Sequence, residues 1–325
     1  MMVVLSLFDG CGMAYQALKN LGIKVDKYYA SEVDKWAMQI SQRNHPDIIN
    51  LGSVSTVNRS CLSGVPPFLL IGGSPCQDLS VAKSGGEGLD GSRSGLFWEY
   101  VRCLLQLKPK YFLLENVASM KAVHKETISI ALKVEPILIN SSLLTAQNRK
   151  RLYWTNIQNI TQPKEVDTIL QDVLEEGVAD RQKSFCLDAS YYKGGNLKQY
   201  KEKSRRQLIF LGGIEGKRKK WLENGKELSR NFSQEQRVYA PQGLSSTLSA
   251  NGGGLGATTG LYYTEEGVRK LTPIECERLQ GLPDNYTEGV SNTQRYKMIG
   301  NGFTVPVIEH ILSFMELPCL KGDKQ

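Results

Sequence analysis

The feature that most constrains the fold of this chain is the alternation of short apolar runs with helical patterns through its first half. The apolar runs cover residues 3–7, 28–30, 68–71, 111–114 and 134–139. The helical patterns cover residues 14–21, 35–43, 94–107 and 119–132. Strands that alternate with helices in this way are typical of a doubly wound, mostly parallel sheet. The sequence therefore predicts an α/β fold.

Reactive side chains follow four of the predicted strands. Asp9, Glu32, Cys76 and Glu115 each fall at or just beyond the end of a strand. Ligands of doubly wound sheets bind beyond the carboxyl ends of the strands. We therefore expect these four side chains to contribute to one site.

The first of these strand ends carries a glycine-containing loop, Phe8-Asp9-Gly10-Cys11-Gly12, that opens a helix. Glycines at such a place let backbone N–H groups approach a ligand near the helix N-terminus. Glu32 ends the next strand, 23 residues after Asp9, and an acid at that distance can accept hydrogen bonds from a ribose. Because the third glycine of a dinucleotide fingerprint is missing, an adenosine site is favoured over a phosphate-binding one.

Cys76 lies in the stretch GGSPCQDLS, directly after an apolar run. A thiolate there can act as a nucleophile, although an inert buried cysteine is the alternative for the residue taken alone. Glu115, in LLENV, offers a carboxyl that can serve as a proton donor. Arg149 and Arg151, in QNRKR, are two residues apart and should point to one side of an extended segment. Their alternative is simple surface charge.

The second half of the chain has a different character. Residues 160–268 are polar, basic and rich in glycine, with short aromatic strands expected at 191–192 and 262–263. Residues 193–230 hold twelve Lys and Arg against four Glu, which indicates either a surface that contacts a polyanion or a solvated face. An apolar helix over residues 305–317 would return the chain to the first domain. We expect two domains, residues 1–160 with 300–325 and residues 161–299.

Composition argues against several other classes of protein. No apolar stretch reaches the roughly 18 residues of a membrane span, and the N-terminus resembles a first strand more than a signal peptide. The seven cysteines include no CxxC pair, which favours a reducing cytosol over disulfides or a zinc site. His45, His124 and His310 have no metal-ligand spacing, so no metal is expected.

One further stretch, Thr272-Pro273-Ile274-Glu275, predicts the start of a helix. Thr272 would cap the helix, Pro273 would take its first position, and Glu275 would complete a capping box. Gly281 would end the helix. The stretch therefore shapes the second domain and is not expected to do chemistry.

Taken in order, these motifs resemble those of the DNA (cytosine-5)-methyltransferases. FDGCG resembles the cofactor loop, ASEVD the ribose-binding acid, GGSPCQDLS the catalytic loop, SGLF the helix after it, and LLENV the acid motif. QNRKR matches Gln-x-Arg-x-Arg, RKLTPIECERLQGLP resembles the scaffold helix, and GNGFTVPVI the closing cofactor motif. The opening is similar to animal de novo enzymes, whereas the compact length and KSFCLDASYYKGGN are more similar to bacterial or phage enzymes.

The resemblance implies a Rossmann-like methyltransferase domain, a smaller irregular target-recognition domain, and a reaction on a flipped cytosine. Cys76 would attack C6, Glu115 would hold N3 and N4 and protonate N3, and Arg149 and Arg151 would steady the base and the thiolate. The methyl donor would be S-adenosylmethionine, and the base must leave the duplex because C6 is inaccessible in the stack.

By the same resemblance, further residues would contact the cofactor and the DNA. The cofactor contacts would be Phe8, Asp9, Gly10, Gly12, Met13, Glu32, Val33, Ser53, Val54, Pro75, Leu96 and Asn301. The DNA contacts would be Gln77, Ser80, Arg93, Gln147, Arg205, Arg206, Lys217, Arg218 and Gly253. Two departures concern the cofactor: Ser53 stands where the family usually has an aspartate, and Met13 where a further glycine is frequent.

The expected partner is double-stranded DNA, with the chain acting as a monomer in the cytoplasm of a prokaryotic or phage-infected cell. A cognate restriction endonuclease acting separately is compatible with the resemblance. Two alternatives stay open. One is methylation of cytosine in transfer RNA, which a branch of the family performs. The other is a catalytically silent DNA-binding regulator, to which Ser53 lends slight support.

Overall fold

A single large sheet dominates the computed structural model, which describes residues 1–74, 96–177, 179–193, 200, 203–210 and 268–317. The sheet has the strand order β3-β2-β1-β4-β5-β7-β6. Its strands are β1 (Val3–Leu7), β2 (Lys27–Ser31), β3 (Ile48–Asn50), β4 (Leu69–Gly73), β5 (Tyr111–Val117), β6 (Ile137–Asn140) and β7 (Lys150–Thr155). The strands from β3 to β5 pair in parallel, and β7 runs antiparallel between β5 and β6. The predicted α/β fold with a mostly parallel sheet is confirmed.

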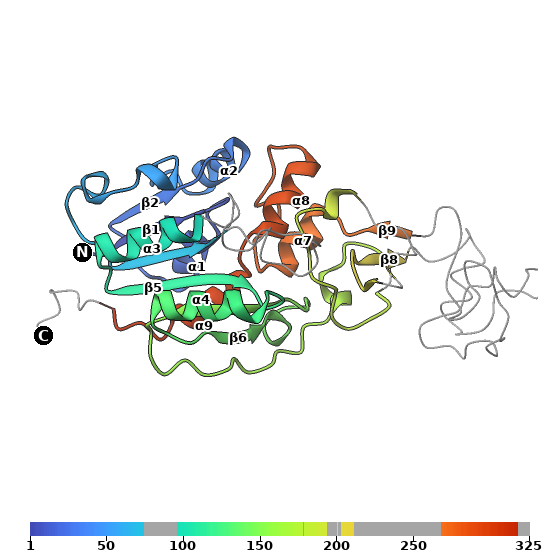
Figure 1. Cartoon of the computed structure of the whole chain (residues 1–325). Coiled ribbons are helices and arrows are strands. Elements are labelled where there is room, and N and C mark those ends of the chain that lie inside the picture. The colour runs from blue at the N-terminus through green and yellow to red at the C-terminus, as the bar shows by residue number, and fades with distance from the viewer. Residues whose placement is uncertain (75–95, 178, 194–199, 201–202, 211–267, 318–325) are drawn as a thin grey trace, which may run out of the picture.

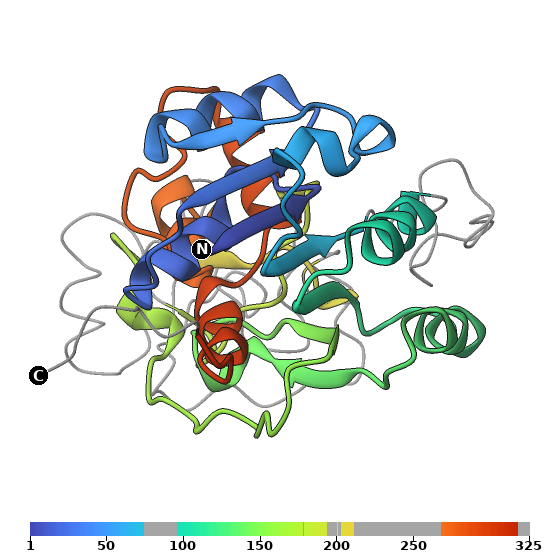
Figure 2. The same cartoon turned by 90° about the vertical axis from the view of Figure 1, so that its left-hand side faces the viewer.

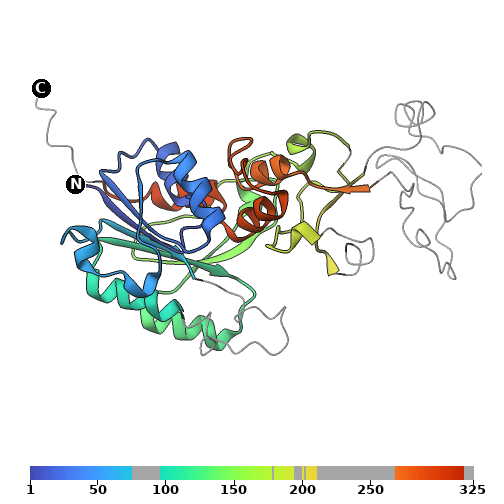
Figure 3. The same ribbon diagram turned by 90° about the horizontal axis from the view of Figure 1, so that it is seen from above.

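Helices cover both faces of this sheet. They are α1 (Met13–Asn20), α2 (Lys35–Asn44), α3 (Leu96–Leu107), α4 (Ala122–Leu132) and α9 (Val305–Leu312). Because side chains alternate along a strand, Val4 packs with α1 and α9 on one face, whereas Leu5 and Leu7 pack with α3 and α4 on the other. Figure 2 shows the sheet descending from its blue strands to its green ones, and Figure 3 shows it between the two helical layers. None of the helices in the described ranges is long and apolar enough to cross a membrane.

The last helix, α9, returns to the first part of the chain as predicted. Its apolar side chains, among them Val307 and Ile311, pack in the same buried cluster as Ala14 and Ala17 of α1. Asn20 at the end of α1 also donates a hydrogen bond to Glu309 of α9. The end of the described chain therefore completes one face of the sheet.

A second group of elements lies beyond the carboxyl ends of the strands (Figure 1). It comprises β8 (Leu208–Phe210), β9 (Val268–Lys270), α7 (Pro273–Leu279) and α8 (Asn292–Asn301). These elements share a buried cluster of their own, which includes Ile209, Leu279 and Tyr296.

The start of α7 has the predicted capping box. Glu275 N donates to Thr272 Oγ1 at 3.2 Å, and Thr272 N donates back to Glu275 Oε2 at 2.8 Å. Pro273 takes the first position, and Gly281, with φ +73°, follows the end of the helix. This helix is therefore defined by local sequence as well as by packing.

The strand predicted at 191–192 is wrong. Tyr191–Lys193 is a turn of 3₁₀-helix, because Ser190 N donates to Asp188 Oδ1 and Tyr191 N to Asp188 O, which bends the chain. Residues 262–263 lie outside the described residues. The division into two domains stays a prediction; α8 runs across its boundary at residue 300.

Candidate active site

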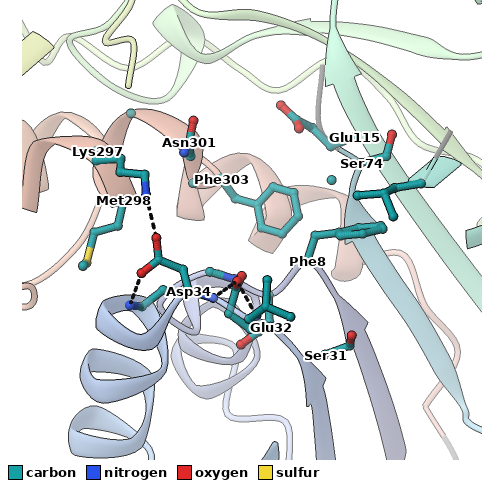
Figure 4. Close-up of a pocket in the computed structure, with 18 of the residues that line it drawn as sticks. Phe8, Ser31, Glu32, Asp34, Ser74, Glu115, Lys297, Met298, Asn301 and Phe303 are labelled. Atoms are coloured by element: carbon teal, nitrogen blue, oxygen red, sulfur yellow. Dashed lines mark hydrogen bonds and ion pairs between the residues drawn. The ribbon is translucent and has the colours of Figure 1, made fainter. Parts of the chain in front are cut away.

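A cavity of about 370 Å³ opens at the carboxyl ends of β1, β2, β4 and β5. Its walls come mainly from the ends of these strands, from the residues that follow them, and from one side of α8 (Figure 4). The starts of α3 and β7 add further lining residues. The sheet order changes direction between β1 and β4, which is where doubly wound sheets bind ligands. The cavity therefore lies where the sequence places the site.

Phe8 begins the loop after β1 in an uncommon backbone conformation. Its φ is +58°, in the left-handed region that a bulky side chain rarely adopts. Figure 4 shows the Phe8 ring beside the cavity, across from Phe303. Gly10, two residues later, also has a positive φ of +62°. Glycine adopts this conformation without strain, whereas at Phe8 it persists only because the surrounding structure imposes it, as often happens at ligand sites.

Glu32, directly after β2, is held by backbone N–H groups. Gly10 N donates to Glu32 Oε2 at 2.8 Å. Val33 N and Asp34 N donate to Oε1 at 2.7 and 2.8 Å. These three hydrogen bonds fix the orientation of the Glu32 carboxylate. Glu32 therefore joins the loop after β1 to the start of α2 at the cavity wall.

Asp9 is a buried part of the same wall, with 4% of its surface exposed. Its Oδ1 accepts a hydrogen bond from Tyr28 Oη at 2.6 Å, while Oδ2 has no partner among the described residues. Burial raises the pKa of Asp9 to about 6. An unsatisfied buried acceptor next to a cavity fits a ligand that brings an N–H donor or a cation.

Glu115 and Arg151 form an ion pair at the other end of the cavity. Arg151 Nε lies 2.7 Å from Glu115 Oε1, and the side chains are 14% and 12% exposed. In the antiparallel pairing of β5 with β7, Arg151 stands opposite Val117, two residues beyond Glu115. The two side chains therefore lie diagonally on one face of the sheet. This geometry holds the carboxylate at the cavity wall.

Arg149 lines the same cavity but is buried, with 3% of its surface exposed. It donates to Leu187 O at 2.9 Å, Gly300 O at 3.1 Å and Gly302 O at 2.8 Å. Its Nε is buried without a partner among the described residues. Arg149 thus ties the start of β7 to the end of α8 and keeps one N–H group unused. The prediction that it shares a side with Arg151 agrees with the cavity lining.

Most of the predicted residues inside the described ranges meet at this cavity. Those that line it are Phe8, Asp9, Gly10, Glu32, Val33, Ser53, Val54, Leu96, Glu115, Arg149, Arg151 and Asn301. They come from segments that are almost 300 residues apart in the sequence (Figure 4). Folding therefore brings these distant positions together at one cavity.

Gly12 and Met13 do not line the cavity, so the structure does not support cofactor contacts from them. Gly12 has φ +83°, and a Cβ there would lie 2.9 Å from the His45 ring, so the glycine permits close packing of the loop on α2. Met13 is 1% exposed in the core, and a Cβ on Gly302 would lie 2.2 Å from its sulfur. Both residues therefore support the loop by packing on its side away from the cavity.

Gln147 is also placed differently from the prediction, because it is fully buried and cannot reach DNA in this conformation. Its amide donates to Leu279 O at 3.2 Å and accepts from Leu187 N at 3.0 Å. It therefore joins the segment before β7 to α7 in the second group of elements. Arg205 is exposed and Arg206 partly exposed. Eight predicted residues lie outside the described ranges: Pro75, Cys76, Gln77, Ser80, Arg93, Lys217, Arg218 and Gly253.

Several lining residues escaped the sequence analysis. Phe303 and Gly73 lie beside Glu115: a Cβ on Gly73 would come within 3.1 Å of Glu115 Oε2 and 3.2 Å of the Phe303 ring. Gly73 therefore leaves room for both side chains. Asp34 and Lys297 also line the cavity. Phe303 and Gly73 belong to the motifs GNGFTVPVI and GGSPCQDLS, which could have indicated them, whereas no sequence signal links Asp34 to Lys297.

Comparison with known proteins identifies the family. The sequence model of the C-5 cytosine-specific DNA methylases matches residues 2–316. The orphan methyltransferase M.Rho11sI of Bacillus phage rho11s is 31% identical over 94% of this chain and 68% of its own length. The type II methyltransferase M.HhaI of Haemophilus parahaemolyticus is 29% identical over 94% of this chain and 92% of its own length.

The fold also matches solved structures. A Spodoptera frugiperda DNMT2 mutant aligns over 97% of this chain and 99% of its own, with a TM-score of 0.65 and 17% identity. The family match covers nearly the whole chain, and the two relatives align over both the sheet and the second group of elements. The chain therefore belongs to the C-5 cytosine-specific DNA methylases and is a DNA (cytosine-5-)-methyltransferase.

Proposed function

We propose that this protein transfers a methyl group from S-adenosylmethionine to C5 of a cytosine flipped out of a specific duplex DNA sequence. The observation that carries the proposal is the composition of the cavity. One end holds Glu32 and Asp9, suited to a nucleoside with a cationic tail. The other end holds Glu115 paired with Arg151, suited to a polar heterocycle. A cofactor and a base would meet in one enclosure.

The cofactor end fits S-adenosylmethionine in two respects. The Glu32 carboxylate would accept hydrogen bonds from the ribose, and the unpartnered Asp9 Oδ2 would accept from the ammonium group. The other residues that would hold the cofactor are Phe8, Gly10, Val33, Ser53, Val54, Pro75, Leu96 and Asn301. When bound, the cofactor supplies an electrophilic methyl group on a sulfonium.

The base end would activate cytosine, which is a poor nucleophile at C5. The Cys76 thiolate would form a bond to C6 while Glu115 delivers a proton to N3, leaving an enamine whose C5 takes the methyl group. Loss of the C5 proton to a base would then expel the thiolate and restore the ring. Arg151 would hold Glu115 in place, and the unused Nε of Arg149 would face the base or the thiolate.

The substrate would be drawn from duplex DNA, because a base must leave the stack before C6 can be attacked. Arg205, Arg206, Lys217 and Arg218 would contact phosphates, which makes binding salt-dependent. Gln77, Ser80, Arg93 and Gly253 would lie near the extruded base or the recognised sequence. The protein would act as a monomer in the cytoplasm, with any partner endonuclease acting separately.

The test is bisulfite sequencing of DNA from a methylation-deficient bacterium that expresses the chain, beside a Cys76→Ala control. Protection of cytosine in one sequence context, lost in the control, is the expected result. A covalent adduct with DNA containing 5-fluorocytosine should form with the unmodified protein, while Cys76→Ala should bind the same DNA without an adduct. If the protein is folded but no cytosine of the bacterial DNA is protected from bisulfite conversion, the proposal is contradicted.

A second substrate class has a specific observation behind it, the likeness of the fold to a DNMT2 structure. One branch of the family methylates cytosine in transfer RNA. The same purified protein should therefore be offered labelled methyl donor with duplex DNA and with transfer RNA in parallel. Incorporation into transfer RNA alone would favour this second function. DNA binding without incorporation into either would favour a silent regulator.

A further inference from the structure

The cofactor end of the cavity is closed by one face of α8. Gln294, Lys297, Met298 and Asn301 line the cavity at helical spacing. The opposite face of the same helix is anchored elsewhere, because Tyr296 is buried and its hydroxyl donates to Leu271 O at 2.7 Å. The helix is therefore fixed to the second group of elements on one side and faces the cavity on the other.

An ion pair crosses from this helix to the opposite wall. Lys297 Nζ lies 2.6 Å from Asp34 Oδ2, and Figure 4 shows the two side chains reaching toward each other from α8 and α2. Residues 34 and 297 are 263 positions apart. In the described structure the pair thus connects two segments that the chain brings together only on folding.

Asp34 also contacts Glu32, so it connects Lys297 to the Glu32 carboxylate. Its Oδ1 accepts from Trp36 N at 3.0 Å and Ala37 N at 3.4 Å, which caps α2, and its N–H donates to Glu32 Oε1 at 2.8 Å. Burial opposes ionisation of Asp34, but the hydrogen bonds from Lys297 and Trp36 lower its pKa below the ordinary value. A displacement of Lys297 would therefore shift Asp34 and, through its N–H, the Glu32 carboxylate that is proposed to hold the ribose.

We propose that Lys297 is a positioning residue of the cofactor site: acting through Asp34, it holds α8 against the Glu32 wall and slows the departure of the bound cofactor or its product. The inference rests on the proposed function. Lys297 and Asp34 are 45% and 29% exposed, and pairs of that exposure are weak and screened by salt. The contact therefore breaks and reforms readily, which suits a site that must release its product after each reaction.

The test measures the dissociation rate constant of S-adenosylhomocysteine by stopped-flow displacement. Lys297→Gln should dissociate about twofold to fivefold faster than the unmodified protein, and Lys297→Arg should stay close to it. Asp34→Asn keeps an oxygen to cap α2, so it should match Lys297→Gln, and the double variant should be no faster than either. Lys35→Gln, which removes an exposed neighbouring charge away from the cavity, serves as the control and should change nothing.

Salt separates positioning from a general structural role. In the unmodified protein the dissociation rate should rise from low to high salt, whereas in Lys297→Gln it should be nearly constant. Equal rates for Lys297→Gln and the unmodified protein, or additive effects in the double variant, would overturn the inference while leaving the proposed function intact. Failure of the unmodified protein to bind S-adenosylhomocysteine or S-adenosylmethionine in calorimetry would overturn both.

Discussion

Two regions of this protein each contain a buried carboxylate, and the two carboxylates differ in how many of their oxygens have hydrogen-bond partners. In α7, Glu275 is fully buried and accepts four hydrogen bonds, two from Arg269 at 2.7 Å and one each from Glu175 N and Thr272 N at 2.8 Å. At the cavity, Asp9 is nearly as buried but keeps Oδ2 without a partner in the described structure.

The difference separates Glu275, whose hydrogen bonds hold α7 in place, from Asp9, which we propose serves a ligand. Removing one partner of a buried, hydrogen-bonded charge pair is strongly destabilising, because the other charge is left uncompensated. A buried carboxylate oxygen without a hydrogen-bond partner lowers the stability of the ligand-free protein, and it can accept a hydrogen bond when a ligand binds in the cavity. Substitutions in the two regions should therefore move different observables.

The largest expected effect is on catalysis at Glu115. Glu115→Gln should lower the rate of methyl incorporation about a hundredfold or more, because an amide cannot deliver the proton to N3. The thermal unfolding midpoint should fall less than in Glu275→Ala, since the amide oxygen can still accept a hydrogen bond from Arg151. Single-turnover methylation with saturating DNA measures the effect. Unchanged activity would place proton delivery elsewhere.

The next effect is on stability at Glu275. Glu275→Ala should lower the free energy of unfolding by about 3–5 kcal/mol, because it removes both carboxylate hydrogen bonds of the mostly buried Arg269 guanidinium. Denaturant unfolding followed by circular dichroism measures this change. At low temperature the folded fraction should still bind S-adenosylhomocysteine with ordinary affinity. A loss of affinity without loss of stability would break the distinction between the two regions.

Asp9 should behave in the opposite sense to Glu275. Burial raises its pKa to about 6, so between the unfolded value and about pH 6 the folded state binds more protons, and stability falls as pH rises through that window. Asp9→Asn keeps an oxygen for Tyr28 and removes the charge. It should stabilise the ligand-free protein by at most about 3 kcal/mol at about pH 8, and by little at about pH 4.

Thermal unfolding of the unmodified protein and Asp9→Asn across this pH range checks the sign. The same variant should bind S-adenosylmethionine more weakly if Asp9 accepts the ammonium group. A variant that is destabilised at about pH 8 would show that the charged carboxylate is satisfied in the folded protein, contrary to the distinction drawn here.

The smallest effect concerns the cap of α7. Thr272→Ala removes the side-chain oxygen that accepts from Glu275 N and should cost about 1 kcal/mol of stability. Thr272→Ser keeps that oxygen and should restore most of the loss. Denaturant midpoints of the two variants give the comparison, and methylation per folded molecule should stay constant in both. Equal midpoints would show that packing alone holds the helix start.

The sheet could be predicted because its signals are local. The strand over residues 3–7 was predicted with the bounds that β1 has, since a short apolar run between polar loops leaves little freedom. The capping box at Thr272 is equally local. By contrast, Tyr191 was predicted in a strand from its aromatic character, and a hydrogen bond to Asp188 turns the chain there instead.

The site could be predicted where a motif carries its own chemistry, as at Glu32 and Glu115. It could not be predicted where a motif residue faces inward: Gln147 and Gly12 support the structure from behind, and only packing decides that. Lys297 and Asp34 meet across 263 positions, and nothing in either local sequence indicates the other.

The short β8–β9 pair has a consequence for how such enzymes diverge. Phe210 and Val268 stand opposite each other in that ladder, so the interval between them begins and ends at one place on the framework. Recombination that replaces residues 211–267 with an interval of another length would leave the register of β8 and β9 unchanged. Exchange of this interval therefore need not disturb the sheet that carries the cavity, because β8 and β9 form a separate two-stranded sheet.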